Sequence, residues 1–131
     1  MLRLAGFEAT LRWQPVRGQI VTAGWSGLSG AHDALGGLLS EYVYNFPVEN
    51  VHAGWRAALG RGFTVNNGVN VVKRYQATPY AVWNSTWMRE QGRVQPYLRL
   101  NNLANTGYEE ISGVRMQGRS IVGGVTVQLG R

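Results

Sequence analysis

Cysteine is absent from this 131-residue chain, and charged residues make up only 15% of it. Without cysteine the fold contains neither disulfides nor a thiolate metal site. No apolar run approaches the ~20 residues that a membrane helix requires, which excludes a helical membrane protein but not one that crosses with alternating strands. The low charge and the 18 glycines favour a β protein with tight turns over a helical bundle or a disordered segment.

A concentrated basic patch is also lacking, although the net charge is +6. The arginines are scattered singly, and the one adjacent basic pair is Lys73 and Arg74. No basic run interleaves with aromatic residues, as it would on a nucleic-acid-binding surface. We therefore predict no nucleic-acid partner and interpret most of this charge as solvated surface.

What the sequence does contain is a period of two along almost its whole length, which is typical of β-strands. Apolar and polar residues alternate in seven segments of roughly 9–12 residues, longer than the usual strands of globular sheets. These segments are residues 2–13, 18–26, 50–59, 63–72, 80–89, 94–101 and 119–129.

The connections between the segments alternate strictly between short and long. Short turns are expected at residues 14–18, 60–62 and 91–92, and long connections at 27–49, 74–79 and 102–118. In an antiparallel meander this places all short turns at one end of the sheet and all long loops at the other. An outer-membrane barrel has that arrangement, with short periplasmic turns and long external loops.

Each predicted strand has one apolar, aromatic face and one face of Asn, Thr, Ser, Gln and isolated Arg. Alternation alone does not say which face is buried, because a soluble barrel also alternates. Strand length, the mostly uncharged polar faces, and the position of Trp13 and Trp87 at strand ends favour a membrane barrel. Trp55 and Trp83 lie in mid-strand and do not contribute to such an aromatic girdle.

The carboxyl-terminal part adds a specific pattern: a strand and loop "VQPYLRLNNLANTGYEE", the segment "ISGVRMQGR" and a last strand "SIVGGVTVQLG". This part resembles the carboxyl end of a TonB-dependent outer-membrane receptor. Upstream, "LLSEYVYNFPVENVHAGW" and "FEATLRW" resemble other barrel passages of the family. The residues that correspond to the family's terminal motif are Asn102, Leu103, Asn105, Tyr108, Glu109, Gly118 and Arg119.

The resemblance implies an all-β fold: an antiparallel up-and-down meander of about seven strands that forms an open segment of a 22-stranded transmembrane barrel. Residues 1–131 would be the carboxyl-terminal part of that barrel, with the plug domain absent. The parent receptor would import a scarce solute, such as an iron–siderophore or cobalamin, across the outer membrane of a Gram-negative bacterium. Its partners would be outer-membrane lipid, the remaining strands and plug, and the TonB complex through that plug alone. The chain by itself is expected not to transport.

We expect no catalytic residue, no cofactor and no metal, and predict that the chain is not an enzyme. Glu109 and Glu110 are neighbours on an extended chain and point opposite ways, so they do not form an acid/base couple. His32 and His52 lack a metal-ligand spacing and are interpreted as a loop residue and a residue of the barrel interior. Aromatic and basic residues of the long loops are candidate ligand contacts or loop-packing residues: Tyr42, Tyr44, Phe46, Arg74 and Tyr75, with Tyr80 beside them.

Two other interpretations fit the alternation. One is a small self-contained outer-membrane barrel of about eight strands, and the other is a soluble β-barrel that binds a small apolar ligand. The soluble barrel would bury the apolar residues of every strand in one dry interior.

Overall fold

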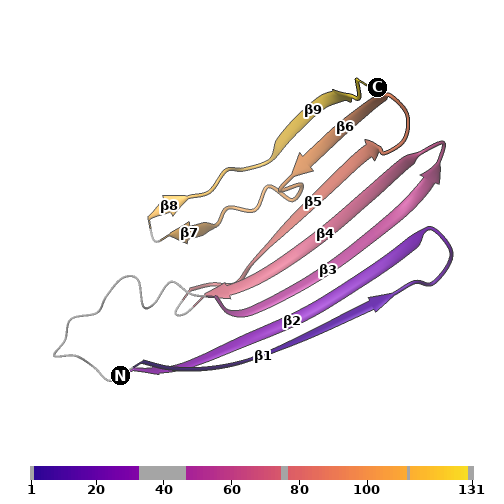
Figure 1. Ribbon diagram of the computed structural model, residues 1–131. Helices are drawn as coiled ribbons and strands as arrows, with labels where there is room; N and C mark the ends of the chain where they lie inside the picture. The colour runs from indigo at the N-terminus through magenta and orange to yellow at the C-terminus, as the bar shows by residue number, and fades with distance from the viewer. Residues whose placement is uncertain (1, 33–46, 75–76, 112, 130–131) are drawn as a thin grey trace.

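The computed structural model describes residues 2–32, 47–74, 77–111 and 113–129, and these residues form strands and connections without a helix. No helix that is long and apolar enough to cross a membrane occurs among them. Figure 1 shows the strands as a curved sheet with a small hairpin at one end. The strands are β1 (Leu2–Trp13), β2 (Gln19–His32), β3 (Pro47–Gly60), β4 (Phe63–Arg74), β5 (Tyr80–Arg89), β6 (Val94–Asn101), β7 (Glu109–Ile111), β8 (Val114–Arg115) and β9 (Ser120–Val127).

Seven of the strands form one antiparallel up-and-down sheet in the order β1-β2-β3-β4-β5-β6-β9. The remaining two, β7 and β8, form a separate hairpin inside the connection from β6 to β9. The predicted meander of about seven strands is therefore confirmed. Its connections alternate as expected between a turn end, with residues 14–18, 61–62 and 90–93, and a loop end, with residues 33–46, 75–79 and 102–119.

The turn between β3 and β4 shows why the sequence permits so tight a reversal. Only Arg61 and Gly62 separate the strands, and their φ angles are 52° and 79°. Two central residues at positive φ are what a type I′ hairpin turn requires, and its twist matches that of the flanking strands.

Two strand boundaries were predicted wrongly by three residues or more, and the other boundaries differ by at most two residues. The expected long connection 27–49 is shorter at both ends, because β2 continues to His32 and β3 begins at Pro47. Gly27 pairs with Phe7, and Ser29 with Ala5, inside the β1–β2 ladder. The glycines of this stretch interrupt the apolar alternation, so the sequence resembles a loop although the backbone remains paired. The β7–β8 hairpin was not predicted, since strands of three and two residues are too short to show a period.

The register places the apolar sets of all seven strands on the same side of the sheet. Residues paired across neighbouring antiparallel strands point to the same face. The apolar face therefore carries the odd-numbered residues of β1 to β5, the even-numbered residues of β6 and the odd-numbered residues of β9, and the polar face carries the others. One row across the apolar face runs through Trp13, Val21, Trp55, Asn67, Ser85, Leu100 and Ile121.

The apolar face is largely exposed. All five tryptophans lie on it, with 40% to 58% of each accessible, and Ile121 is 67% exposed. The buried hydrophobic residues of the described chain are only Ala57, Val65 and Val72. A soluble antiparallel sheet packs its apolar face on a core, so this sheet has the opposite arrangement. A continuous apolar surface of this kind marks contact with a membrane or with another protein.

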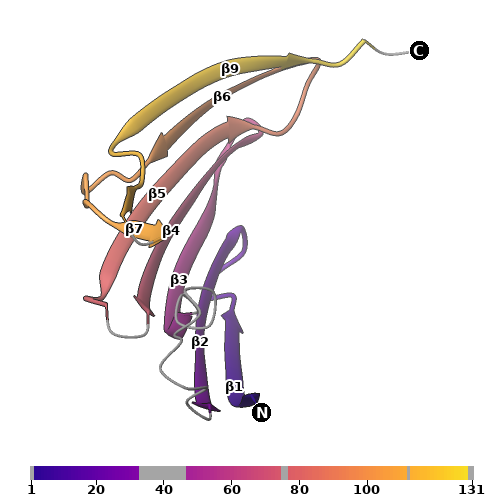
Figure 2. The ribbon, with the colours of Figure 1, turned by 90° about the vertical axis from the view of Figure 1, so that its left-hand side faces the viewer.

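The strands are staggered along the sheet as they are in a barrel wall. Trp13, at the end of β1, lies in the same row as Ile121, near the start of β9. The centres of β1 and β9 are therefore offset along the strand direction by about eight residues, or roughly 26 Å. Across the sheet, the six strand spacings between them span roughly 29 Å. This offset corresponds to a strand tilt of roughly 40°, within the range of barrels. Figure 2 shows the accompanying curvature of the sheet.

Three glycines lie beneath aromatic rings of their cross-strand partners. Phe7 covers Gly27, His52 covers Gly24, and Tyr97 covers Gly124. A Cβ atom built on Gly27 would lie 2.5 Å from Phe7 Cε1, where no real side chain fits. Phe7 in turn meets Trp25 edge-on, with ring centroids 4.5 Å apart. Glycine in these strands thus makes room for a neighbouring ring, as in other curved sheets.

We expect Gly27→Val to lower the free energy of unfolding by about 1–3 kcal/mol, because the new side chain displaces Phe7 and breaks its contact with Trp25. The control is Gly68→Ala, where the nearest atom is Ala53 O at 4.0 Å. The measurement is chemical denaturation of the refolded protein. Equal destabilisation by both substitutions would contradict the proposed role of the covered glycine.

Candidate functional site

Charged residues on the apolar face lie only at its two ends. Lys73 and Glu49 pair across β4 and β3 at the loop end, with Nζ and Oε2 3.9 Å apart. Arg89 lies at the turn end, where its guanidinium carbon is 6.0 Å from the centroid of the Phe63 ring. Between these two rims the described part of the face has no charged side chain.

The distance between the rims has the scale of a membrane. Phe63, which pairs with Arg89, and Lys73 are ten residues apart on β4. That separation is roughly 33 Å along the strand. If the strand is tilted by about 40°, the distance between the two rims, measured within the sheet and perpendicular to them, is roughly 25 Å. Outer-membrane barrels have an outward apolar band of about 25 Å.

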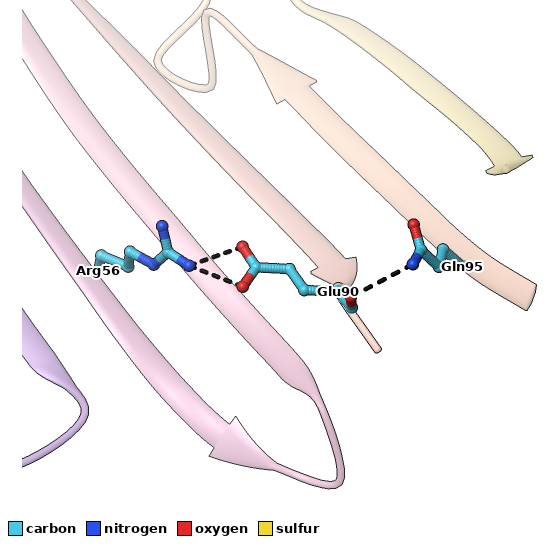
Figure 3. A network of polar contacts seen from close by, with 3 residues as sticks. All are labelled: Arg56, Glu90 and Gln95. Carbon is cyan, nitrogen blue, oxygen red and sulfur yellow. Dashed lines mark hydrogen bonds and ion pairs between the residues drawn. The ribbon is translucent and has the colours of Figure 1, made fainter. Parts of the chain in front are cut away.

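The polar face carries an ion pair near the turn end (Figure 3). Arg56 reaches from β3 across β4, and its Nη2 lies 2.7 Å from both carboxylate oxygens of Glu90. Gln95 Nε2 donates to the backbone oxygens of Glu90 and Gly92, at 3.2 and 3.3 Å. The pair is half-exposed and contributes at most about 1 kcal/mol. Its effect is to hold the 90–93 turn against the polar face.

Other polar atoms on this face lack protein partners. Asn50 Oδ1 and Thr64 Oγ1 are buried without a hydrogen bond to any described residue. His52, interpreted from the sequence as an interior residue, lies on this face above Gly24. Buried polar groups of this kind require water or a partner.

The terminal motif converges on Asn102, which is buried and has a φ of 48°. Its Oδ1 accepts from Thr106 N at 2.9 Å, and its Nδ2 donates to Thr106 O at 2.9 Å and Gln117 O at 3.4 Å. Its own backbone N donates to Asn84 Oδ1 at 2.9 Å. Asn102 therefore joins the end of β6, the loop and β5 in one network.

The other motif residues extend this network. Asn105 Oδ1 accepts from Arg119 N at 2.9 Å, and a Cβ atom on Gly118 would lie 2.8 Å from the same oxygen. Leu103 N donates to Trp83 O at 2.8 Å, which continues the β5–β6 pairing beyond Leu100. The two ends of the 102–119 connection are thus held together by asparagine side chains.

Tyr108 connects the β7–β8 hairpin to the sheet, and Glu109 braces the hairpin itself. The Tyr108 ring stacks on Tyr80 at the start of β5, with centroids 4.6 Å apart. Glu109 Oε2 accepts from Gly113 N at 2.9 Å within the hairpin. Burial raises the pKa of Tyr108, and Glu110 and Tyr80 raise it further. Tyr80, a candidate ligand contact, is thus engaged in packing the loop.

The remaining loop candidates are not brought together by the described residues. Tyr42, Tyr44, Phe46 and Tyr75 lie outside the described residues. Arg74 is the last residue of β4 and is partly buried beside the loop end. The sequence analysis did not identify Asn84 as a residue that holds the loop. An asparagine in the middle of a strand does not indicate which backbone group its side chain contacts.

The described residues contain no group of three or more His, Asp or Glu side chains that could hold a metal ion. No family model, no curated protein and no solved structure matches the chain. The described surface consists of an apolar face with charged rims, a polar face and a braced loop.

Replacing Asn102 tests the loop network. We expect Asn102→Gly to cost about 1–3 kcal/mol of stability through lost hydrogen bonds. Asn102→Ala should cost about 1–2 kcal/mol more, because alanine resists positive φ. Denaturation midpoints and hydrogen exchange at the Thr106 and Arg119 amides provide the measurement. Equal effects of the two variants would exclude the backbone contribution, and unchanged exchange would exclude the network.

Tyr108 makes the loop sensitive to alkali. Its folded pKa is raised above the ordinary value of 10.0, so the folded state holds this proton more tightly than the unfolded state. The resulting stability is fully present below pH 10 and is lost as the pH rises through the raised pKa. Denaturation midpoints from about pH 9 to about pH 11 should fall more steeply than in Tyr108→Phe, which keeps the stacked ring. Parallel pH curves would contradict this.

Proposed function

We propose that this chain forms part of the wall and external loops of a TonB-dependent outer-membrane receptor that imports a scarce solute, such as an iron–siderophore or cobalamin. The observation that carries the membrane part of the proposal is the exposed apolar face, which holds all five tryptophans and is charged only at its rims. The family part is carried by the resemblance of the carboxyl-terminal motif.

The geometry supports a transmembrane orientation. Strand tilt, the separation of the rims and the segregation of short turns from long connections agree with an outer-membrane barrel. In this orientation the apolar face contacts lipid, and the polar face with Arg56, Glu90 and His52 lines the interior. The turn end lies toward the periplasm and the loop end toward the outside.

The same orientation assigns different roles to the strands and to the external connection. The strands supply a rigid wall, and the Asn102 network fixes the external 102–119 connection on that wall. The resemblance implies that solute binds outside, that the TonB complex acts on a plug, and that solute then passes through the lumen. In this proposal the chain supplies wall and loops, and the energy coupling acts on the plug.

The rival interpretations differ in what they require of the apolar face. A soluble β-barrel that binds an apolar ligand needs a dry interior, but Phe7, Leu11, Val69, Leu98 and Val125 are each at least 37% exposed. A small eight-stranded outer-membrane barrel shares the lipid contact. Closure into a small barrel gives heat-modifiable migration on gels after refolding in micelles, which an open segment does not.

Tryptophan fluorescence tests the membrane assignment, because every tryptophan of the chain lies on the apolar face. In bilayers whose acyl chains carry bromine, we expect strong quenching relative to bilayers of unmodified lipid, with a blue-shifted emission. Trp→Phe variants remove the signal one position at a time. Cooperative folding in water without detergent, with no quenching by brominated lipid, would contradict the assignment.

The family assignment has an independent test. The genomic DNA upstream of Met1 is expected to encode, in the same frame, further alternating strands and a plug domain. If the upstream DNA encodes neither barrel strands nor a plug in this frame, the receptor proposal is wrong. The proposed contact of the sheet with lipid does not depend on that result.

A further inference from the structure

Each of the three short turns carries an arginine, and the three turns lie at the same end of the sheet (Figure 1). These residues are Arg17, Arg61 and Arg93. All three are exposed, and none of their side chains forms an ion pair or a hydrogen bond with a described residue. Glu90 is the one acidic residue in the sequence of these turns, and Arg56 binds its carboxylate at 2.7 Å. The turn end therefore presents a row of unpaired positive charges.

The connections at the loop end have the opposite net charge. Their sequence contains four acidic residues and two basic residues, which are Asp33, Glu41, Glu109, Glu110, Arg115 and Arg119. The turns contain three arginines and one glutamate, so their net charge is +2, whereas that of the loop connections is −2. A negatively charged partner is therefore attracted to the turn end rather than to the sheet as a whole.

Arg61 has a backbone conformation that arginine does not favour. It takes the first central position of the type I′ turn with a φ of 52°, where asparagine, aspartate and glycine are the usual residues. The left-handed region is sterically unfavourable for other L-residues. No ion pair or hydrogen bond from the Arg61 side chain to a described residue offsets this cost. An outlier of this kind indicates a functional contact with a group outside the described chain.

The arginines of the turns adjoin the rim of the apolar face. Arg89 lies on that face, with its guanidinium carbon 6.0 Å from the centroid of the Phe63 ring. Trp13 and Trp87, both exposed, lie on the same face near the turn end. Tryptophan is enriched at membrane interfaces, and an arginine there lays its aliphatic stem along apolar surface while its charge reaches the headgroups.

We propose that the turn-end rim, made up of Arg17, Arg61, Arg89 and Arg93, binds the headgroups of anionic phospholipids. A guanidinium group can donate two parallel hydrogen bonds to one phosphate. Adjacent turns are two strand spacings apart, roughly 10 Å, so separate arginines contact separate headgroups along the rim. The inference rests on the membrane orientation proposed above, in which this end lies at the periplasmic leaflet.

The unpaired charge of the rim selects anionic over zwitterionic lipid. Phosphatidylcholine also carries a phosphate, but its choline group cancels that charge. Phosphatidylglycerol has no cationic group and keeps a net negative charge. One arginine near a membrane surface changes binding to anionic lipid by about fivefold, so a rim with several arginines should prefer phosphatidylglycerol by at least this factor.

Brominated lipid measures which lipid lies beside the apolar face, because all five tryptophans lie on that face. The refolded chain is placed in two bilayers of identical composition, phosphatidylcholine with a minor fraction of phosphatidylglycerol. Bromine is carried by the phosphatidylglycerol in one bilayer and by an equal amount of phosphatidylcholine in the other. We expect brominated phosphatidylglycerol to quench more strongly, with a relative binding constant of about five or more. Added salt should reduce the difference.

Two triple variants locate the preference. Replacing Arg17, Arg61 and Arg93 by glutamine should lower the relative binding constant several-fold, whereas replacing them by lysine keeps the charge and should retain most of it. The control removes the same charge at the loop end, through Lys73→Gln, Arg115→Gln and Arg119→Gln, and should leave the constant unchanged.

Arg61→Gly keeps the test decisive if the triple glutamine variant does not fold. This substitution removes one charge and also relieves the positive φ, so the variant should be at least as stable as the parent chain. Its relative binding constant should nevertheless fall, by up to about fivefold. An unchanged constant in folded Arg61→Gly would contradict the role of this residue.

The outcomes separate this inference from the proposed function. Equal quenching by the two brominated lipids, or a preference that the loop-end control loses as fully as the turn-end variant, would overturn the lipid site while leaving the membrane wall intact. Absence of quenching by either lipid would overturn the membrane orientation, and the lipid site with it. A preference for phosphatidylglycerol that only the turn-end variants lose supports both.

Discussion

The cross-strand register is the constraint on which the rest of this structure depends. Each strand alternates independently, and a shift of one residue between any two strands would move a whole apolar set to the other face. The row from Trp13 through Asn67 to Ile121 shows that no such shift occurs across the seven strands. One face is therefore apolar across the sheet, and backbone pairing holds the fold together in place of a packed core.

That arrangement explains several features that would be liabilities in a soluble protein. Large exposed tryptophans, few buried apolar residues and charges confined to the rims follow if the solvent of the apolar face is lipid. Glycines beneath Phe7, His52 and Tyr97 let rings lie flat against the curved sheet. Beyond the loop end of the β6–β9 ladder, the side chains of Asn102 and Asn105 supply hydrogen bonds in place of backbone pairing.

Period-two patterning was sufficient to predict the meander, the alternation of short and long connections, and the bounds of β1, β5 and β6. Period-two patterning failed at Gly27, where a glycine takes the place of an apolar residue on the apolar face. The Phe7 ring that covers this glycine belongs to another strand, so the segment itself shows no apolar residue there. The patterning did not reveal the role of Asn84, since this depends on which backbone group lies beside it. Likewise, Asn102 and Asn105 were identified by resemblance alone, because their bonds depend on left-handed backbone conformations.

The most direct test of the central claim is water accessibility along β4 in lipid bilayers. The chain lacks cysteine, so single cysteines at 66, 69, 70 and 71 can be labelled with a membrane-impermeant maleimide. The account predicts labelling at 66 and 70, on the polar face, and protection at 69 and 71, on the apolar face. Labelling at 69 and 71 with protection at 66 and 70 would contradict it.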